Sequence, residues 1–276
     1  QLPPVLAQDF ELNDLSKLKS IQNTAIKTTM ERMEEIGLFS RWTDSLFERL
    51  WFLNDRNGWK GMVTLDTHFR MHEHIAQALS SHYLPTELKV GNDFQQSDWL
   101  IRDGWGEKSH QRRLVFVENR ILDRGKVNRS EADDLARIVL QLISRKSQEQ
   151  DWGDFIGIIT PWRAQIEEIK EAIRRQRTLS DLQVEIEKLI PIDTVERFQG
   201  SEADYILFST CVNGRNYLEA LTSTEQNGVD RKLLVAVSRA RKQFVLLGNR
   251  QFLIDSSPYE QLINWIEING KVLSMD

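Results

Sequence analysis

The sequence predicts an α/β protein in which a parallel β-sheet is flanked by helices on both faces. Short apolar runs, such as 155–160 and 244–247, are typical of strands that are buried on both sides. These runs alternate with helical patterns of about 11–15 residues, in which apolar residues recur every three or four positions. Together they indicate β-α-β units, the repeating unit of parallel sheets.

Each expected element follows from its own pattern. The strands are expected at Leu114–Val117, Phe155–Thr160, Asp204–Ser209 and Phe244–Leu247. The helices are expected at His72–Tyr83, Glu131–Arg145, Arg163–Ile173, Arg231–Arg241 and Pro258–Ile268. Asn128 or Ser130 can cap the second of these helices, because a side-chain oxygen satisfies a free backbone N–H there. The segment Gly91–Arg113 lacks a clean period and is expected to be a loop or a small insertion.

Composition excludes several classes of protein. The chain has 276 residues, of which 40% are hydrophobic and 28% charged, so it is neither disordered nor a small disulfide scaffold. Its single cysteine favours a reducing compartment, and we expect a cytoplasmic protein, or a nuclear one in a eukaryote. No apolar run approaches the ~20 residues of a membrane span. A net charge of −5 argues against a generally basic nucleic-acid binder, although a basic groove can exist locally.

Several chemical motifs are missing. The sequence holds no G-x-x-x-x-G-K-[ST] P-loop, no H-E-x-x-H and no C-x-x-C. Four of the five histidines lie between His68 and His82, but without cysteine or well-placed carboxylates we predict no metal site. Ligands of parallel sheets gather at the carboxyl ends of strands, where Thr160–Arg163 and Ser209–Asn213 are expected.

Four segments carry a recognisable pattern. They are Thr67–His72, Ile158–Gln165, Asp193–Glu202 and Leu234–Arg241. Their order resembles the second motor domain of superfamily 1 nucleic-acid helicases, in the subgroup of the nonsense-mediated-decay helicase and the Okazaki-fragment nuclease-helicase. Members carry Y-R-M-H, T-P-Y-x-x-Q, T-V-D-x-F-Q-G-x-E and N-V-A-L-T-R-A-[RK]. The opening Gln1–Pro4 resembles the Q-L-P-P that closes the first motor domain.

The match has departures. Phe69 and Trp162 replace tyrosines and Glu196 replaces an aspartate, which are mild changes. Leu234 stands where the family has asparagine, which puts in doubt one hydrogen bond near the nucleotide.

The resemblance implies a RecA-like fold that lacks its own P-loop. ATP and Mg²⁺ would be held mainly by a first motor domain of the same polypeptide. Arg70 and Arg239 would act as arginine fingers on the γ-phosphate, and Gln1 would orient the attacking water. Arginine suits this task because its planar fork is always charged and binds phosphate in two places.

The resemblance also assigns a second group of nucleotide-side residues. Glu202 would contact the ribose or the γ-phosphate side, and Gln199 would link nucleotide and nucleic acid. Gly200 is expected to permit an unusual backbone angle in the turn between them. Arg241 either supports the phosphates or, as a cation at the end of a helix, only complements the helix dipole.

Single-stranded DNA or RNA is the other expected ligand. Thr160 and Thr194, each at the end of a strand, can donate hydroxyls to the sugar–phosphate backbone, whatever the bases are. Pro161 belongs to the same motif, and Arg163 either adds charge or merely begins a helix. Trp162 either stacks a base or fills the groove beneath the loop, and we favour packing.

The domain boundary is expected near residue 60. Residues 1–60 would be a helical remnant and connector of the first motor domain, and residues 61–276 the second motor domain. The surface expected to face the first domain consists of Leu46, Phe47, Leu50 and Trp51. Because the sequence does not start with Met, the chain is expected to be a fragment or a processed product. The leading hypothesis is therefore half of an ATP-driven helicase or translocase, inactive alone. The alternatives are a degenerate motor domain that serves as a binding platform and, more weakly, a nucleotide-using metabolic enzyme.

Overall fold

A computed structural model describes residues 65–80, 88–96, 112–119, 125–143, 146, 148–177, 186–223 and 229–274. The chain divides into two units, Gln1–Leu65 and Asp66–Asp276. Gln1 and the apolar residues Leu46, Phe47, Leu50 and Trp51 lie outside the described residues, so their expected roles stay predictions. No helix among the described residues is long and apolar enough to cross a membrane.

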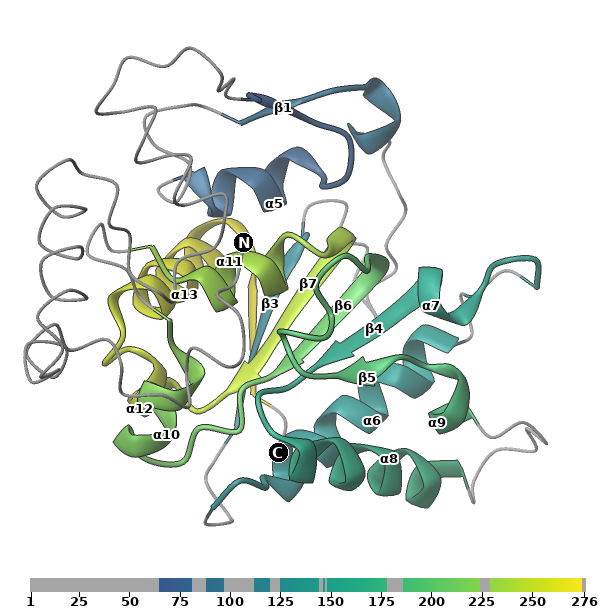
Figure 1. Cartoon of the computed structure of the whole chain (residues 1–276), viewed down its shortest axis with the longest axis vertical. Coiled ribbons are helices and arrows are strands. Elements are labelled where there is room, and N and C mark those ends of the chain that lie inside the picture. The colour runs from purple at the N-terminus through teal and green to yellow at the C-terminus, as the bar shows by residue number, and fades with distance from the viewer. Residues whose placement is uncertain are drawn as a thin grey trace, which may run out of the picture. The chain divides into compact units, whose positions relative to one another are not determined.

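The second unit is built on a six-stranded parallel sheet, as the sequence predicts (Figure 1). All neighbouring pairs are parallel, in the order β5-β4-β6-β7-β3-β8. The strands of this sheet are β3 (Leu114–Glu118), β4 (Ile156–Ile159), β5 (Ile192–Asp193), β6 (Ala203–Ser209), β7 (Ala240–Gly248) and β8 (Lys271–Ser274). All seven residues of β6 are buried, which explains why its centre, Tyr205–Phe208, is a continuous apolar run rather than an alternating pattern.

Helices cover both faces of the sheet (Figure 1). On one face lie α6 (Arg129–Ile143) and α8 (Arg163–Arg177), with the short α7 (Trp152–Phe155) and α9 (Ile186–Leu189) nearby. The other helices that follow or precede the strands are α10 (Arg215–Leu221), α11 (Arg231–Val237), α12 (Arg250–Leu253) and α13 (Ser257–Asn269).

A smaller body precedes the sheet in the chain. It contains the parallel pair of β1 (Thr67–His68) with β2 (Lys89–Val90), the helix α5 (Glu73–Ala78) and a 3₁₀ turn over Asp93–Gln96. The backbone N–H of His72 donates to the carbonyl of Arg241 at 3.1 Å, which fixes this body to β7. The expected loop over Gly91–Arg113 is described only in part, and its described beginning is the 3₁₀ turn.

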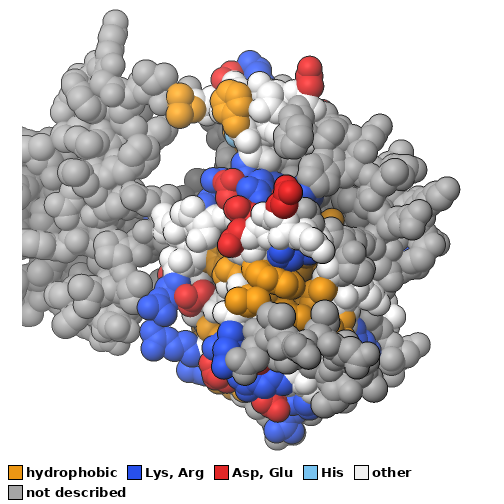
Figure 2. Space-filling view, turned by 90° about the vertical axis from the view of Figure 1, so that its right-hand side faces the viewer, with side chains coloured by type: hydrophobic (Ala, Val, Ile, Leu, Met, Phe, Trp, Pro, Cys, Tyr) orange, Lys and Arg blue, Asp and Glu red, His pale blue; other side chains and the backbone are white. Residues whose placement is uncertain are grey.

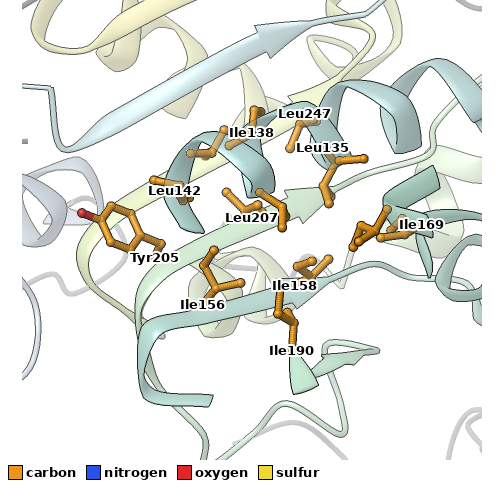
Figure 3. Close-up of a cluster of buried hydrophobic side chains, with 14 of the residues drawn as sticks. Leu135, Ile138, Leu142, Ile156, Ile158, Ile169, Ile190, Tyr205, Leu207 and Leu247 are labelled. Atoms are coloured by element: carbon orange, nitrogen blue, oxygen red, sulfur yellow. The ribbon is translucent and has the colours of Figure 1, made fainter. Parts of the chain in front are cut away.

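The core beneath α6 and α8 holds the sheet and its helices together. Leu135 and Ile138 of α6 and Ile169 of α8 lie around Ile158 and Leu207 of the central strands (Figure 3). Burying one such side chain contributes about 1.5–3 kcal/mol, so these contacts dominate the stability of this layer.

Element boundaries differ from the expectations in two places. The pattern predicts one helix over Arg231–Arg241, but α11 ends at Val237, and Ala240 and Arg241 already belong to β7. The expected strand over Phe155–Thr160 is shorter, because Phe155 ends the short helix α7, which Asp151 caps. The other expected strands and helices with described residues are confirmed within a few residues, and Asn128 is the side chain that caps α6.

Candidate functional site at the two edges of the sheet

The sequence-predicted residues fall into two groups at opposite ends of the strands. Arg70, Glu202, Arg239 and Arg241 gather where β6 and β7 begin, which we call the amino edge. Thr160–Arg163 and Thr194 lie where β4 and β5 end, which we call the carboxyl edge. The seven residues of β6 separate the two edges by roughly 20 Å at ~3.3 Å per residue.

At the amino edge, Arg70 and Arg239 meet on the same residue. Arg70 Nη1 donates to the Ser238 carbonyl at 3.3 Å, and Arg239 Nη2 donates to the Ser238 hydroxyl at 3.3 Å. Arg239 also donates to the carbonyls of Val235 at 3.2 Å and Ser201 at 3.4 Å. Both arginines are half-buried, and both guanidinium groups are held by hydrogen bonds.

Glu202 lies between two guanidinium groups. It pairs with Arg70 and, at 3.4 Å, with Arg241. Burial alone would raise the pKa of Glu202, but the hydrogen bond and charge of Arg70 and the charge of Arg241 outweigh burial and lower this pKa. Glu202 is therefore ionised at neutral pH and neutralises part of the positive charge.

Arg241 is tied to the sheet more firmly than Arg70. Its guanidinium donates to Asp204 at 3.0 Å and to the Asp154 carbonyl at 2.6 Å. Asp204 also accepts hydrogen bonds from the side chains of Lys242 and Gln150. Since Arg241 lies in β7, the suggested helix-dipole role does not apply to it, and its bonds are those of a residue that organises the edge. From the side where α7 and α9 lie, Figure 2 shows basic and acidic side chains next to one another above a hydrophobic patch.

The sequence did not single out His68, which holds the turn at this edge in place. His68 Nδ1 accepts the backbone N–H groups of Arg70 at 3.4 Å and Met71 at 3.3 Å, which shapes the turn that carries Arg70. Burial lowers the pKa of His68, and the charge of Arg70 lowers it further, so the ring stays neutral and can accept. The histidine two positions before Arg70 was the available signal.

The turn before β6 has the expected shape. Gly200 adopts a φ of +97°, which a side chain would strain. Gln199 beside it is exposed and touches no other predicted site residue in the described hydrogen bonds. A Cβ at Gly157 would lie 2.4 Å from the Phe198 ring, so this glycine lets the segment between β5 and β6 pack closely on β4.

At the carboxyl edge, the two threonines are neighbours. Ile159 is paired with Asp193, and the N–H of Thr160 donates to the Asp193 carbonyl at 3.1 Å, which places Thr160 beside Thr194. Thr160 is fully buried, and its hydroxyl has no hydrogen-bond partner in the part of the chain that is described. Arg163, the first residue of α8, is exposed, and Pro161 is half-buried.

Trp162 packs against other side chains. Its ring meets the Tyr217 ring edge to face at 6.1 Å between centroids, and Lys126 Nζ lies 4.9 Å from the centre of the Trp162 ring. The ring is therefore in packing contacts, while its part in nucleic-acid binding stays a prediction.

A buried polar network lies behind the carboxyl edge. Glu131 of α6 accepts from the Ser209 hydroxyl at 2.7 Å, the Cys211 N–H at 2.9 Å and Asn128 Nδ2 at 3.0 Å. Gln165 of α8 joins it through Asn128 and Ser209. Burial raises the pKa of Glu131 to about 7, although its three donors oppose the shift. The network fixes the starts of α6 and α8 and the end of β6 against one another.

Comparison with known proteins identifies the family. A family model described as an AAA domain (AAA_12) matches residues 42–251. The chain belongs to the superfamily 1 helicases. Within this family it groups with the nonsense-mediated-decay-like members, as the four sequence motifs suggested.

The relatives are moderately similar. The chain is 28% identical to "Helicase sen1" of Schizosaccharomyces pombe over 81% of its length and 12% of that protein. It is 28% identical to "Regulator of nonsense transcripts 1 homolog" of Drosophila melanogaster over 84% of its length and 18% of that protein. It therefore spans less than a fifth of either relative. A solved C-terminal domain of a possible DNA helicase from Lactobacillus is 13% identical, with a TM-score of 0.39 over 74% of this chain and 98% of that one.

Proposed function

We propose that this chain is the second motor domain of an ATP-dependent DNA or RNA helicase or translocase. ATP and Mg²⁺ would be held mainly by a P-loop domain of the same polypeptide, since the chain has no P-loop of its own. The observation that carries the proposal is that Arg70 and Arg239 both contact Ser238, with both residues half-buried at one edge. Two cations placed side by side suit the charge of a γ-phosphate.

The amino edge would act on the nucleotide. Arg70 and Arg239 would stabilise the charge that develops on the γ-phosphate oxygens, as arginine fingers do. Glu202 would release Arg70 to the phosphate and turn to the ribose, while Arg241 stays with Asp204 and keeps the edge in shape. The triphosphate would therefore replace Glu202 as the anion next to Arg70.

The carboxyl edge would hold one strand of nucleic acid. Thr160, Pro161, Trp162 and Arg163 follow β4, and Thr194 follows β5, so one strand could pass over both ends. Hydroxyls and an exposed arginine suit phosphates and are indifferent to base identity. The hydroxyl of Thr160 would need a small rearrangement to reach a phosphate, because it is buried in the free chain.

One segment connects the two edges. Residues 194–202 run from the end of β5 to the start of β6, so they carry Thr194 at one end and Glu202 at the other. Gln199 and Gly200 lie on this segment. A shift of Glu202 on ATP binding would therefore be transmitted to Thr194. This connection supports the coupling role expected for Gln199 and a cycle in which the two motor domains close on ATP and open after hydrolysis.

The test uses a polypeptide that carries this chain behind a P-loop domain. Arg239→Ala is expected to lower nucleic-acid-stimulated ATP turnover by about 10³-fold, because a finger acts mainly on the transition state. ATP affinity, measured with a fluorescent analogue, should change much less. The matched control is Arg175→Ala, which removes an exposed arginine paired with Asp133 on the outer side of α8. Equal ATP turnover in both variants would contradict the assignment of Arg239 as an arginine finger.

A degenerate motor domain is the second candidate. Leu234, in place of the family's asparagine, lies half-buried on α11 one turn before Ser238 and offers no polar group to a nucleotide. Such a domain would bind nucleic acid or a partner without ATP turnover. Absence of stimulated ATPase in the two-domain polypeptide, with nucleic-acid binding intact, would favour this candidate.

A further inference from the structure

Helices that begin at the carboxyl edge share an unusual first residue. The helices that follow β3, β4, β6 and β7 begin with Arg129, Arg163, Arg215 and Arg250. The start of a helix carries a partial positive charge, so a cation there is unfavourable for the helix. Helix stability therefore does not account for the arginines on the two long helices, α6 and α8. An anion bound at this edge would offset this unfavourable charge.

Three connections meet in a cluster of a cation and two rings. Lys126, which precedes α6, lies over Trp162 after β4, and Trp162 meets Tyr217 of α10 edge to face. Lys126 is exposed, while both rings are half-buried and so present part of their surface. Asn213 Nδ2 donates to the Gly125 carbonyl at 2.9 Å, which ties the Lys126 segment to the segment that follows β6.

This cluster rests on a rigid base. Asn128 donates its N–H to Gln165 at 2.8 Å, and Gln165 returns a hydrogen bond to the Asn128 carbonyl at 2.9 Å. Gln165 also donates to Ser209 at 3.1 Å, and all three residues are buried. The backbone that carries Lys126 and Trp162, two and three residues before Asn128 and Gln165, is therefore anchored before any ligand arrives, which reduces the entropy cost of binding.

The side chains present select one class of ligand. Lys126 and Arg129 are exposed cations, and Arg129 keeps 69% of its side chain accessible although Glu168 lies 3.8 Å away. Cations next to aromatic rings match single-stranded nucleic acid, which presents phosphates and base faces at the same time. An acidic peptide would use the cations but offers nothing that requires the rings.

We propose that Lys126, Arg129 and Tyr217 form a binding surface for single-stranded nucleic acid, continuous with Thr160–Arg163. Lys126 and Arg129 bind phosphates, and Tyr217, supported by Trp162, stacks against a base or sugar. The strand then passes the connections that follow β3, β4 and β6, rather than only those that follow β4 and β5. This inference rests on the proposed nucleic-acid function and extends it to residues outside the four motifs.

The first test measures how these cations bind phosphates. Binding of this chain to fluorescein-labelled 20-nucleotide oligo(dT) and oligo(U) is followed by anisotropy at several KCl concentrations. Lys126→Ala/Arg129→Ala is expected to bind at least tenfold more weakly, and its salt slope should fall by about 0.7 for each phosphate that the variant no longer neutralises. The matched control is Lys146→Ala, since Lys146 lies over Trp152 at 4.8 Å on the amino edge.

The second test measures stacking. Tyr217→Ala is expected to weaken binding about fivefold or more with the salt slope unchanged, because a stacked ring carries no charge. Tyr217→Phe keeps the ring and should bind as the wild type does. Thermal unfolding of each variant is measured to check that the fold is intact.

The outcomes separate this inference from the function on which it rests. If the wild type binds, Arg163→Ala weakens binding and the double variant matches Lys146→Ala, the extended surface is wrong and the proposed function stands. A salt slope that does not change in the weakened double variant would also overturn the role of Lys126 and Arg129 in binding phosphates. If the wild-type chain binds neither oligonucleotide, the nucleic-acid function of this chain is itself contradicted.

Discussion

Glu131 is a buried residue that stabilises the backbone next to the proposed nucleic-acid surface. It is fully buried, accepts three hydrogen bonds and joins α6 to the end of β6. One of its donors is the N–H of Cys211, whose φ of +50° is unusual for a residue with a side chain. The carboxylate thus stabilises a strained backbone directly after β6, next to the segment that carries Asn213 and Tyr217.

The raised pKa of Glu131 predicts a pH dependence of stability. Its pKa is about 7 in the folded chain and 4.5 for an unperturbed carboxyl, so between these values the folded state holds a proton that the unfolded state has lost. Stability should therefore fall as pH rises from about 5 to 7, by about 3 kcal/mol for a shift of this size. Glu131→Gln should remove this decline, measured by urea unfolding at pH 5, 6, 7 and 7.5.

The control for this experiment is Glu167→Gln, the same change at an exposed position of α8. It should keep the wild-type pH profile, including the part that comes from Asp134, whose pKa burial also raises. Parallel profiles for the wild type and Glu131→Gln would show that Glu131 does not titrate as its burial suggests.

Among the elements, α6 depends most visibly on its first turn. Asn128 Oδ1 accepts the N–H of Glu131 at 3.2 Å, and the same side chain donates to the Glu131 carboxylate. A cap of this kind satisfies one of the free N–H groups at the helix start. Because this cap is buried, its removal also leaves polar groups without partners.

Asn128→Ala is accordingly expected to lower the free energy of unfolding by roughly 2 kcal/mol, at the upper end for an N-cap. Asp151→Ala provides the comparison, because Asp151 caps the four-residue α7 at an exposed site. That change should cost less than about 1 kcal/mol. Equal decreases in urea unfolding would mean that the buried network adds nothing to the cap.

At the scale of the whole molecule, the proposed nucleotide and nucleic-acid residues are separated by the length of a strand. The paired arginines lie where β6 and β7 begin, and the threonines and Arg163 lie where β4 and β5 end. The central strand β6 is fully buried, and among the described residues the segment 194–202 runs directly from one edge to the other. Each edge should therefore contact its own ligand, with the segment 194–202 as the link between them.

In a polypeptide that also carries the P-loop domain, substitutions at the two edges should lower different quantities. Arg163→Ala should weaken binding of single-stranded nucleic acid about tenfold, with ATP turnover near wild type once nucleic acid is saturating. Arg239→Ala should abolish most turnover and leave nucleic-acid affinity almost unchanged. Anisotropy and a coupled ATPase assay measure both quantities, and a decrease of turnover in Arg163→Ala at saturation would contradict the separation.

The sequence by itself determined the sheet, the family and most of the residues of interest. Short, continuous apolar runs indicate strands that are buried on both sides. Because helical patterns lie between these runs, they predict β-α-β units and therefore a parallel sheet. The motifs around Arg70, Thr160, Glu202 and Arg239 identified the helicase family that the comparisons confirm. These features are local, so a linear pattern is enough to reveal them.

Only the tertiary structure decided which of those residues are neighbours. Arg70 and Ser238 are 168 positions apart, and Lys126, Trp162 and Tyr217 come from three connections, so no local period relates them. Likewise, β7 begins at Ala240 although the pattern there favours a helix, because pairing of Ala240 with Ala203 extends the strand. Long-range pairing and burial outweigh local preference in such places, since propensities are worth less than about 1 kcal/mol per residue.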